Sequence, residues 1–179
     1  MVDPRSLGPE ALEILATREL RKAGLEPIGL RVRRRERVGA DAASFTLDLA
    51  GRLECYGHRW SVLVECRNAA APLAPADLDA LRRRADEAHA ASAILFTTAE
   101  PGEEAARRAD ELRIAVLRVV DGRTAFTAAG LVEPGQLPLW LPELTAEVVS
   151  WRDGALRRTL VSAGRPESIL EPLRPRPAS

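Results

Sequence analysis

Alternation of apolar and polar side chains marks two neighbouring strands in the first half of the chain. Residues 45–49 alternate so that Asp48 falls on the polar side of an otherwise apolar strand. Residues 60–67 alternate in the same way and place Glu65 and Arg67 together on one side. The pattern predicts a pair of strands that brings two carboxylates and one cation onto the same face of a sheet.

Helical and extended patterns follow one another over the first 130 residues. Apolar residues at helical spacing predict helices over 10–24, 77–90 and 103–113, the first of them ending at Gly24. Strand patterns cover 28–38, 93–98 and 114–120, and Asp121 and Gly122 then turn the chain. This order indicates an α/β protein with a mixed central sheet flanked by helices.

The composition changes after residue 130. Prolines and glycines give residues 131–142 the character of a linker, and Arg152, Asp153 and Gly154 form a hairpin signal between strands over 145–151 and 155–162. Repeated prolines from Arg165 onward indicate a loose tail. We therefore expect one domain over residues 1–130, followed over 131–179 by a linker, a C-terminal β-hairpin appendage and a Pro-rich tail. The hairpin is expected to serve packing, a dimer surface or a partner.

The paired carboxylates have two interpretations. Asp48 and Glu65 brought together repel each other, and a hard cation such as Mg²⁺ or Mn²⁺ relieves that repulsion through oxygen ligands. Such a site is the minimum requirement for metal-assisted hydrolysis of a phosphodiester. The alternative is that these charged side chains lie near strand ends and reach solvent.

The order of elements over residues 9–130 resembles that of the Mrr-type restriction endonucleases, within the PD-(D/E)xK nuclease superfamily. Asp48 takes the place of the motif Asp, Glu65-Cys66-Arg67 the place of (D/E)xK, and the strand over 93–98 ends in two threonines. The resemblance implies a restriction-endonuclease-like fold and a Mg²⁺-dependent endonuclease that acts on DNA. It further implies that Asp48 and Glu65 bind the metal.

Arg67 departs from this family pattern, in which the last motif residue is Lys. An arginine stays protonated and cannot accept a proton, although it can hold a phosphate and stabilise charge on it. Arg67 is therefore the third candidate catalytic residue, and its identity keeps open an alternative: a catalytically inactive nuclease-fold domain that binds DNA or a protein. The resemblance also suggests Glu13 as an accessory residue near the metal, against the simpler interpretation of a solvated helix residue. Asp41 is the alternative metal-binding Asp.

A row of arginines occupies the strand over 28–38. Strand alternation puts Arg31, Arg33, Arg35 and Arg37 on one face. The row is either the solvated side of an edge strand, where charge prevents aggregation, or a set of phosphate contacts to nucleic acid.

Charge and composition narrow the functional classes. The formal net charge is +0, which argues against a purely electrostatic nucleic-acid binder but allows a local basic face. We expect DNA as the partner, with a homodimer or a specificity-giving protein partner as further possibilities, and a purely structural or assembly module as a third functional class. The sequence contains no glycine-rich phosphate loop, so we expect no organic cofactor. Without a long apolar run we expect no membrane contact and a cytoplasmic protein, in which Cys55 and Cys66 stay thiols.

Overall fold

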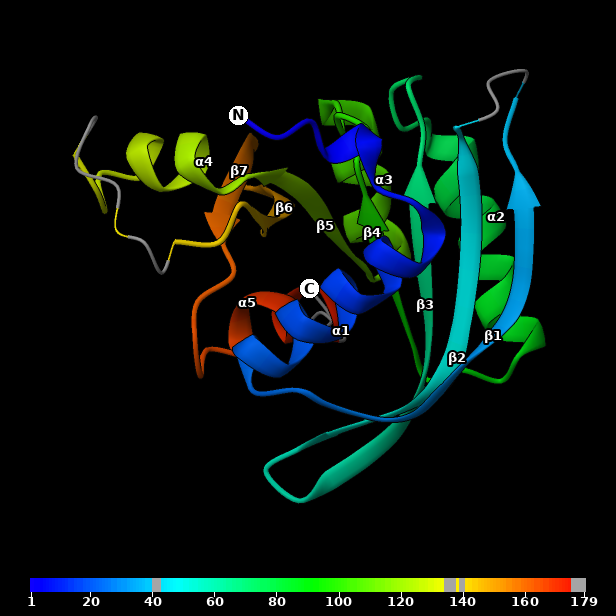
Figure 1. Cartoon of the computed structure of the whole chain (residues 1–179). Helices are drawn as coiled ribbons and strands as arrows, with labels where there is room; N and C mark the ends of the chain where they lie inside the picture. Colours follow the sequence, from blue (N-terminus) through cyan, green and yellow to red (C-terminus); the bar gives the residue numbers. More distant parts are fainter. Residues whose placement is uncertain (40–42, 134–137, 139–140, 175–179) are drawn as a thin grey trace.

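A seven-stranded mixed sheet with helices on both faces forms the centre of the molecule (Figure 1). The computed structural model describes residues 1–39, 43–133, 138 and 141–174. The strands of the sheet are β1 (Glu26–Arg37), β2 (Phe45–Cys55), β3 (His58–Asn68), β4 (Ser92–Thr97), β5 (Ile114–Asp121), β6 (Leu144–Arg152) and β7 (Ala155–Leu160).

Seven short or medium helices accompany these strands in the described part of the chain. The α-helices are α1 (Pro9–Ala23), α2 (Pro75–Glu87), α3 (Glu103–Leu112), α4 (Gly122–Ala128) and α5 (Glu167–Leu170). Two 3₁₀ turns, η1 (Pro4–Ser6) and η2 (Glu171–Leu173), lie near the two ends of the chain.

The strands lie in the sheet in the order in which they occur in the sequence. β1, β2 and β3 are antiparallel neighbours, β3, β4 and β5 run parallel, and β6 and β7 complete the sheet as antiparallel strands. The parallel strands need crossover connections, which α2 and α3 supply. The C-terminal ends of these three parallel strands, which lead into α2, α3 and α4, therefore meet at one edge of the sheet.

Each face of the sheet has its own apolar core. On one face, α1 packs Leu12, Leu15 and Leu20 against β2 and β3, and Ile169 of α5 joins the same cluster. On the other face, Leu78 and Leu81 of α2 pack with the alanines of α3 against β3, β4 and β5. Alternating side chains of β2 and β3 thus face two different helical layers, and this alternation decides on which side the candidate site lies.

The predicted elements over residues 9–121 all form, and the α/β class is confirmed. Most of them keep close to their predicted limits, but β2 continues to Cys55, six residues beyond the predicted strand over 45–49. Gly24 ends α1 in the left-handed region, at φ 94°, where a residue without Cβ is not strained. Helix α4 follows Asp121 where we predicted only a turn, because the Asp121 carboxylate caps it by accepting the Thr124 N–H at 2.9 Å.

Two predictions for the C-terminal region are wrong. The hairpin forms, but it is not an appendage, since β6 pairs along β5 from Val116↔Val149 to Asp121↔Leu144 and so extends the central sheet. The region after Arg165 is not a loose tail throughout, because α5 and η2 form there and Ile169 is fully buried. None of the helices in the described ranges is both long and apolar enough to cross a bilayer.

Candidate functional site

The predicted carboxylate pair forms on the face of the sheet that α2 covers. Asp48 of β2 and Glu65 of β3 are direct cross-strand partners, so their side chains point to the same side. Both are almost fully buried, with 3% and 2% of their surface exposed. The prediction that the two carboxylates lie together on one face is therefore confirmed.

A single guanidinium bridges the pair. Arg84 of α2 donates from Nε to Asp48 Oδ2 at 2.8 Å and from Nη2 to Glu65 Oε2. A planar guanidinium offers several N–H donors in fixed directions and so can bind two carboxylates at once. Arg34 of β1 adds a weaker ion pair to the same Asp48 oxygen at 3.7 Å.

The third motif residue, Arg67, has a carboxylate partner of its own. Its Nη1 lies 2.9 Å from Oδ1 of Asp77, in the first turn of α2, and its side chain is 12% exposed. The other Asp77 oxygen accepts the Ala74 N–H at 3.0 Å, which caps the start of the helix. Arg67 therefore lies on the same face as Glu65 but is held at the beginning of α2, away from Arg84.

Helix α2 positions both of these contacts. Asp77 and Arg84 are seven positions apart, about two helical turns, so they lie on the same side of α2 as Leu81. The sequence predicts α2 but does not single out Arg84, because Arg82, Arg83 and Arg84 point in three directions around the helix. The usable signal was its spacing from Asp77 and its place beside the buried stripe of the helix.

Burial also changes the acid–base properties of the site. Burial raises the pKa of Glu65 from 4.5 to about 7; Arg84 opposes the rise and the Asp48 charge adds to it. Oδ1 of Asp48 and Nε of Arg67 are buried without a hydrogen-bond partner among the described residues. Among the described residues, Asp48 thus keeps one carboxylate oxygen without a partner, while its Oδ2 and Oε2 of Glu65 contact Arg84.

A divalent metal ion does not fit this arrangement. Mg²⁺ takes six oxygen ligands in near-ideal octahedral geometry, and here the guanidinium of Arg84 already binds both carboxylates. A second cation at the same oxygens would be repelled by it. Within the described ranges, no group of three or more His, Cys, Asp or Glu side chains is placed to hold a metal ion.

Two further candidates from the sequence do not join the pair. Glu13 lies on α1, which packs on the opposite face of the sheet, and its charge acts on Cys66 rather than on the carboxylates that Arg84 holds. The accessory role proposed for Glu13 therefore finds no geometric support. Asp41, the alternative metal-binding Asp, lies outside the described residues.

The arginine row on β1 is not confined to one face, which corrects the alternation assumed from the sequence. Two β-bulges interrupt β1, one after Ile28 and one after Val32. Arg31 pairs opposite Ala50, on the face of the carboxylate pair, whereas Arg35 pairs opposite Leu47 on the other face. Each bulge inserts one extra residue and so reverses the alternation of side chains between the two faces. A prediction that assumes an uninterrupted period of two residues does not detect this reversal.

All four arginines of this row are nevertheless exposed. Arg31, Arg33, Arg35 and Arg37 lie on the edge strand of the sheet, and none of them pairs with a carboxylate in the part of the chain that the structure describes. The neighbouring Arg34 differs, since it pairs with Glu36 and Asp48. β1 therefore presents uncompensated positive charge along the edge of the sheet.

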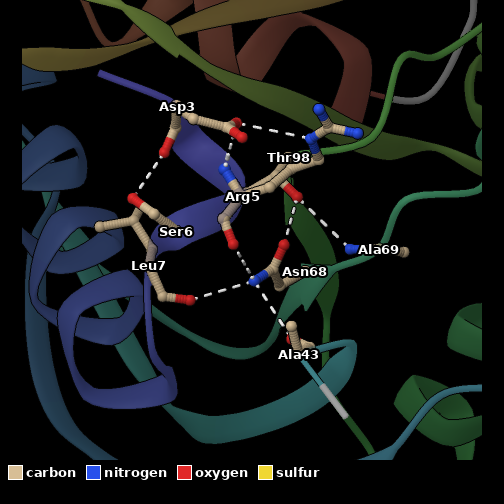
Figure 2. Close-up of polar contacts among 8 residues, drawn as sticks. All are labelled: Asp3, Arg5, Ser6, Leu7, Ala43, Asn68, Ala69 and Thr98. Atoms are coloured by element: carbon tan, nitrogen blue, oxygen red, sulfur yellow. Dashed lines mark hydrogen bonds and ion pairs between the residues drawn. The ribbon is translucent and has the colours of Figure 1, made fainter. Parts of the chain in front are cut away.

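A buried amide fixes the N-terminal segment beside this edge (Figure 2). Asn68, the last residue of β3, donates from Nδ2 to the carbonyl oxygens of Arg5 and Leu7, both at 3.0 Å, and to that of Ala43 at 3.3 Å. Its Oδ1 accepts the Thr98 hydroxyl at 2.8 Å. One side chain thus links the ends of β3 and β4 to the segment that leads into α1.

Comparisons with protein-family models, with curated proteins and with solved structures found no match.

Proposed function

We propose that this chain is a nuclease-type α/β domain of the restriction-endonuclease-like kind that binds DNA without cleaving it. Asp48, Glu65 and Arg67 stand at the motif positions, but the positive charge at the carboxylate pair comes from Arg84. The pair then serves to fix α2 on the sheet. The exposed arginines of β1 provide the contacts to DNA phosphates.

One contrast between two sets of arginines carries this proposal. At the carboxylate pair the cations have carboxylate partners, since Arg84 binds Asp48 and Glu65 while Arg67 binds Asp77. Along β1, Arg31, Arg33, Arg35 and Arg37 have none among the described residues. Paired, half-buried cations hold the fold together, whereas unpaired, exposed cations remain available for an anionic partner.

DNA suits this surface better than a folded acidic protein does. The four arginines follow an extended edge strand, and the bulges direct them to both sides of it. Several unpaired cations along one strand can each neutralise a phosphate of a duplex and release its counterions. A neutral chain with one basic edge also confines non-specific attraction to that edge.

The binding half of the proposal is tested by the salt dependence of DNA affinity. Fluorescence anisotropy of a short labelled duplex is measured over a range of salt concentrations with the wild type and with Arg31→Gln/Arg33→Gln. The double variant should bind more weakly, and the slope of log K against log salt should become shallower by about 1.8, or 0.9 per lost contact.

The matched control removes the same charge elsewhere. Arg83 and Arg107 are exposed residues of α2 and α3 without an ion pair in the described structure, and Arg83→Gln/Arg107→Gln should leave the slope unchanged. Equal slopes for the wild type and the β1 variant would show that these arginines do not contact DNA phosphates. Their remaining role would be to prevent aggregation at the edge strand.

The second candidate function is an active endonuclease, and one observation favours it. Oδ1 of Asp48 is buried without a hydrogen-bond partner among the described residues, and a carboxylate oxygen is the kind of ligand that Mg²⁺ and Mn²⁺ take. Under this alternative, Arg84 must leave the carboxylates before catalysis, and Arg67→Lys should increase nicking of supercoiled DNA in Mn²⁺. Under the leading proposal Arg67→Lys leaves the plasmid intact, because Arg84 still holds both carboxylates.

A further inference from the structure

An open cleft lies between the N-terminal segment and the outer half of β1, on the α1 side of the sheet. Its volume is about 600 Å³, and its walls include Arg5, Arg35, Arg37, Phe45 and the residues that open α1. A space of this size lies within the range of small-ligand pockets. The carboxylate pair is not part of it, because Asp48 and Glu65 lie on the opposite face.

The positive charge in the cleft comes from β1. Arg35 and Arg37 are paired opposite Leu47 and Phe45, so both lie on the α1 face, and neither has a carboxylate partner among the described residues. Glu36, which also borders the cleft, is neutralised by Arg34. Arg5 also borders the cleft, and its guanidinium pairs with the exposed Asp3 at 3.4 Å.

The start of α1 borders the same cleft through Gly8 and Pro9, of which Pro9 has no N–H to donate. The helix begins at Pro9 after Gly8, which has no side chain with which to cap it. Helices of this length carry partial positive charge at the N-terminus, where the first N–H groups have no intrahelical acceptor. Glu10 opposes this charge in part, but it is exposed to solvent.

The walls are not only basic. Leu7 and Phe45 contribute apolar surface beside the guanidiniums, and Phe45 itself is almost buried. A bare inorganic ion uses only the charged part of such a cleft. A ligand with an anionic head and a flatter, less polar body uses both parts.

We propose that this cleft binds a nucleoside phosphate, with the phosphate held by Arg35 and Arg37 near the N-terminal end of α1 and the sugar and base against Leu7 and Phe45. This proposal deepens the DNA-binding function and rests on it. The ligand is either the terminal nucleotide of a DNA strand or a free nucleotide, which share the same chemistry. In the first case the cleft selects DNA ends.

Calorimetric titration tests the cleft directly. The wild type is titrated with a deoxynucleoside 5′-monophosphate and with the corresponding deoxynucleoside, and Arg35→Gln/Arg37→Gln is titrated with the monophosphate. We expect binding of the monophosphate alone, and a loss of at least about tenfold in the double variant, because hydrogen bonds to charged groups are strong. Both positions are exposed, and circular dichroism checks that the variant stays folded.

A second arm separates the two sources of the ligand and the two proposals. Linear duplexes with and without terminal phosphates show whether DNA ends compete with the monophosphate. If only the phosphorylated duplex competes, the cleft binds strand ends. If both duplexes compete equally weakly, the cleft binds free nucleotides. Covalently closed circular DNA tests the β1 surface without any end. Failure of the circle to bind contradicts the DNA-binding function, whereas failure of the monophosphate to bind contradicts the cleft.

The control variant decides whether the effect is local. Arg83→Gln/Arg107→Gln removes the same net charge from α2 and α3 and should bind the monophosphate as the wild type does. If this control loses as much affinity as Arg35→Gln/Arg37→Gln, general electrostatics explains the binding and the cleft is overturned. Equal affinity of Arg35→Gln/Arg37→Gln and the wild type overturns it as well.

Discussion

Replacing Arg84 by methionine removes the cation that Asp48 and Glu65 share while keeping most of the aliphatic volume of the side chain. Breaking a buried ion pair by removing one partner costs roughly 3–5 kcal/mol, since the remaining charge is buried and uncompensated. Asp48 and Glu65 are 3% and 2% exposed, so solvent gives little relief. We therefore expect Arg84→Met to lower the free energy of unfolding by about 3 kcal/mol or more at pH 8.

The loss should be smaller at low pH. At pH 5, Glu65 is protonated in the folded wild type, since its pKa is about 7. Without Arg84 its pKa rises further, so the folded variant also holds this proton, and only Asp48 loses a charged partner. The cost then falls to that of hydrogen bonds to a charged group, roughly 1.5–3 kcal/mol, with Arg34 still 3.7 Å from Asp48.

Urea unfolding followed by far-ultraviolet circular dichroism measures this difference. With an m-value of about 2 kcal/mol/M, a loss of about 3 kcal/mol lowers the midpoint by about 1.5 M at pH 8. Arg83→Met is the matched control, because Arg83 is the exposed neighbour of Arg84 on the same helix. A midpoint for Arg84→Met equal to that of the control, or a loss independent of pH, would refute the reasoning.

The remaining predictions concern the other buried polar groups. Because the folded-state pKa of Glu65 lies above 4.5, its contribution to stability is fully present below pH 4.5 and is lost as the pH rises through 7, an effect of about 3 kcal/mol. Glu65→Gln should flatten urea midpoints over this range, and an unchanged pH dependence would contradict the prediction. Asn68→Ala should cost about 1–3 kcal/mol and speed amide exchange around Leu7, because the carbonyls of Arg5 and Leu7 lose their donor. Thr98→Val should lower the free energy of unfolding by less than Asn68→Ala does. If amide exchange around Leu7 in Asn68→Ala is as slow as in the wild type, Asn68 does not hold the N-terminal segment.

Alternation and helical periodicity were sufficient to predict the pairing of Asp48 with Glu65. The two strands adjoin in sequence, so a hairpin register that buries one apolar face also sets which polar residues meet. The same local logic located α1, α2 and α3. These predictions succeeded because each depends on a few neighbouring residues.

Other features depend on contacts that a local pattern does not encode. Gly29, with φ of 61°, is a sequence signal for the first bulge of β1, but no glycine marks the bulge after Val32. Arg84 reaches the sheet through a long flexible side chain, and its partners lie 19 and 36 positions away. β6 joins the sheet by pairing with β5 across α4 and the segment that follows it, which is why the hairpin was predicted to stand apart.

Incubation of the wild-type protein with supercoiled plasmid DNA in Mn²⁺ tests the central claim most directly, because one gel reports both binding and cleavage. The account predicts that the protein retards the plasmid and that the DNA recovered after removal of the protein is still supercoiled. Nicked or linear product that Asp48→Asn abolishes would contradict it, since the carboxylate pair would then support hydrolysis despite Arg84.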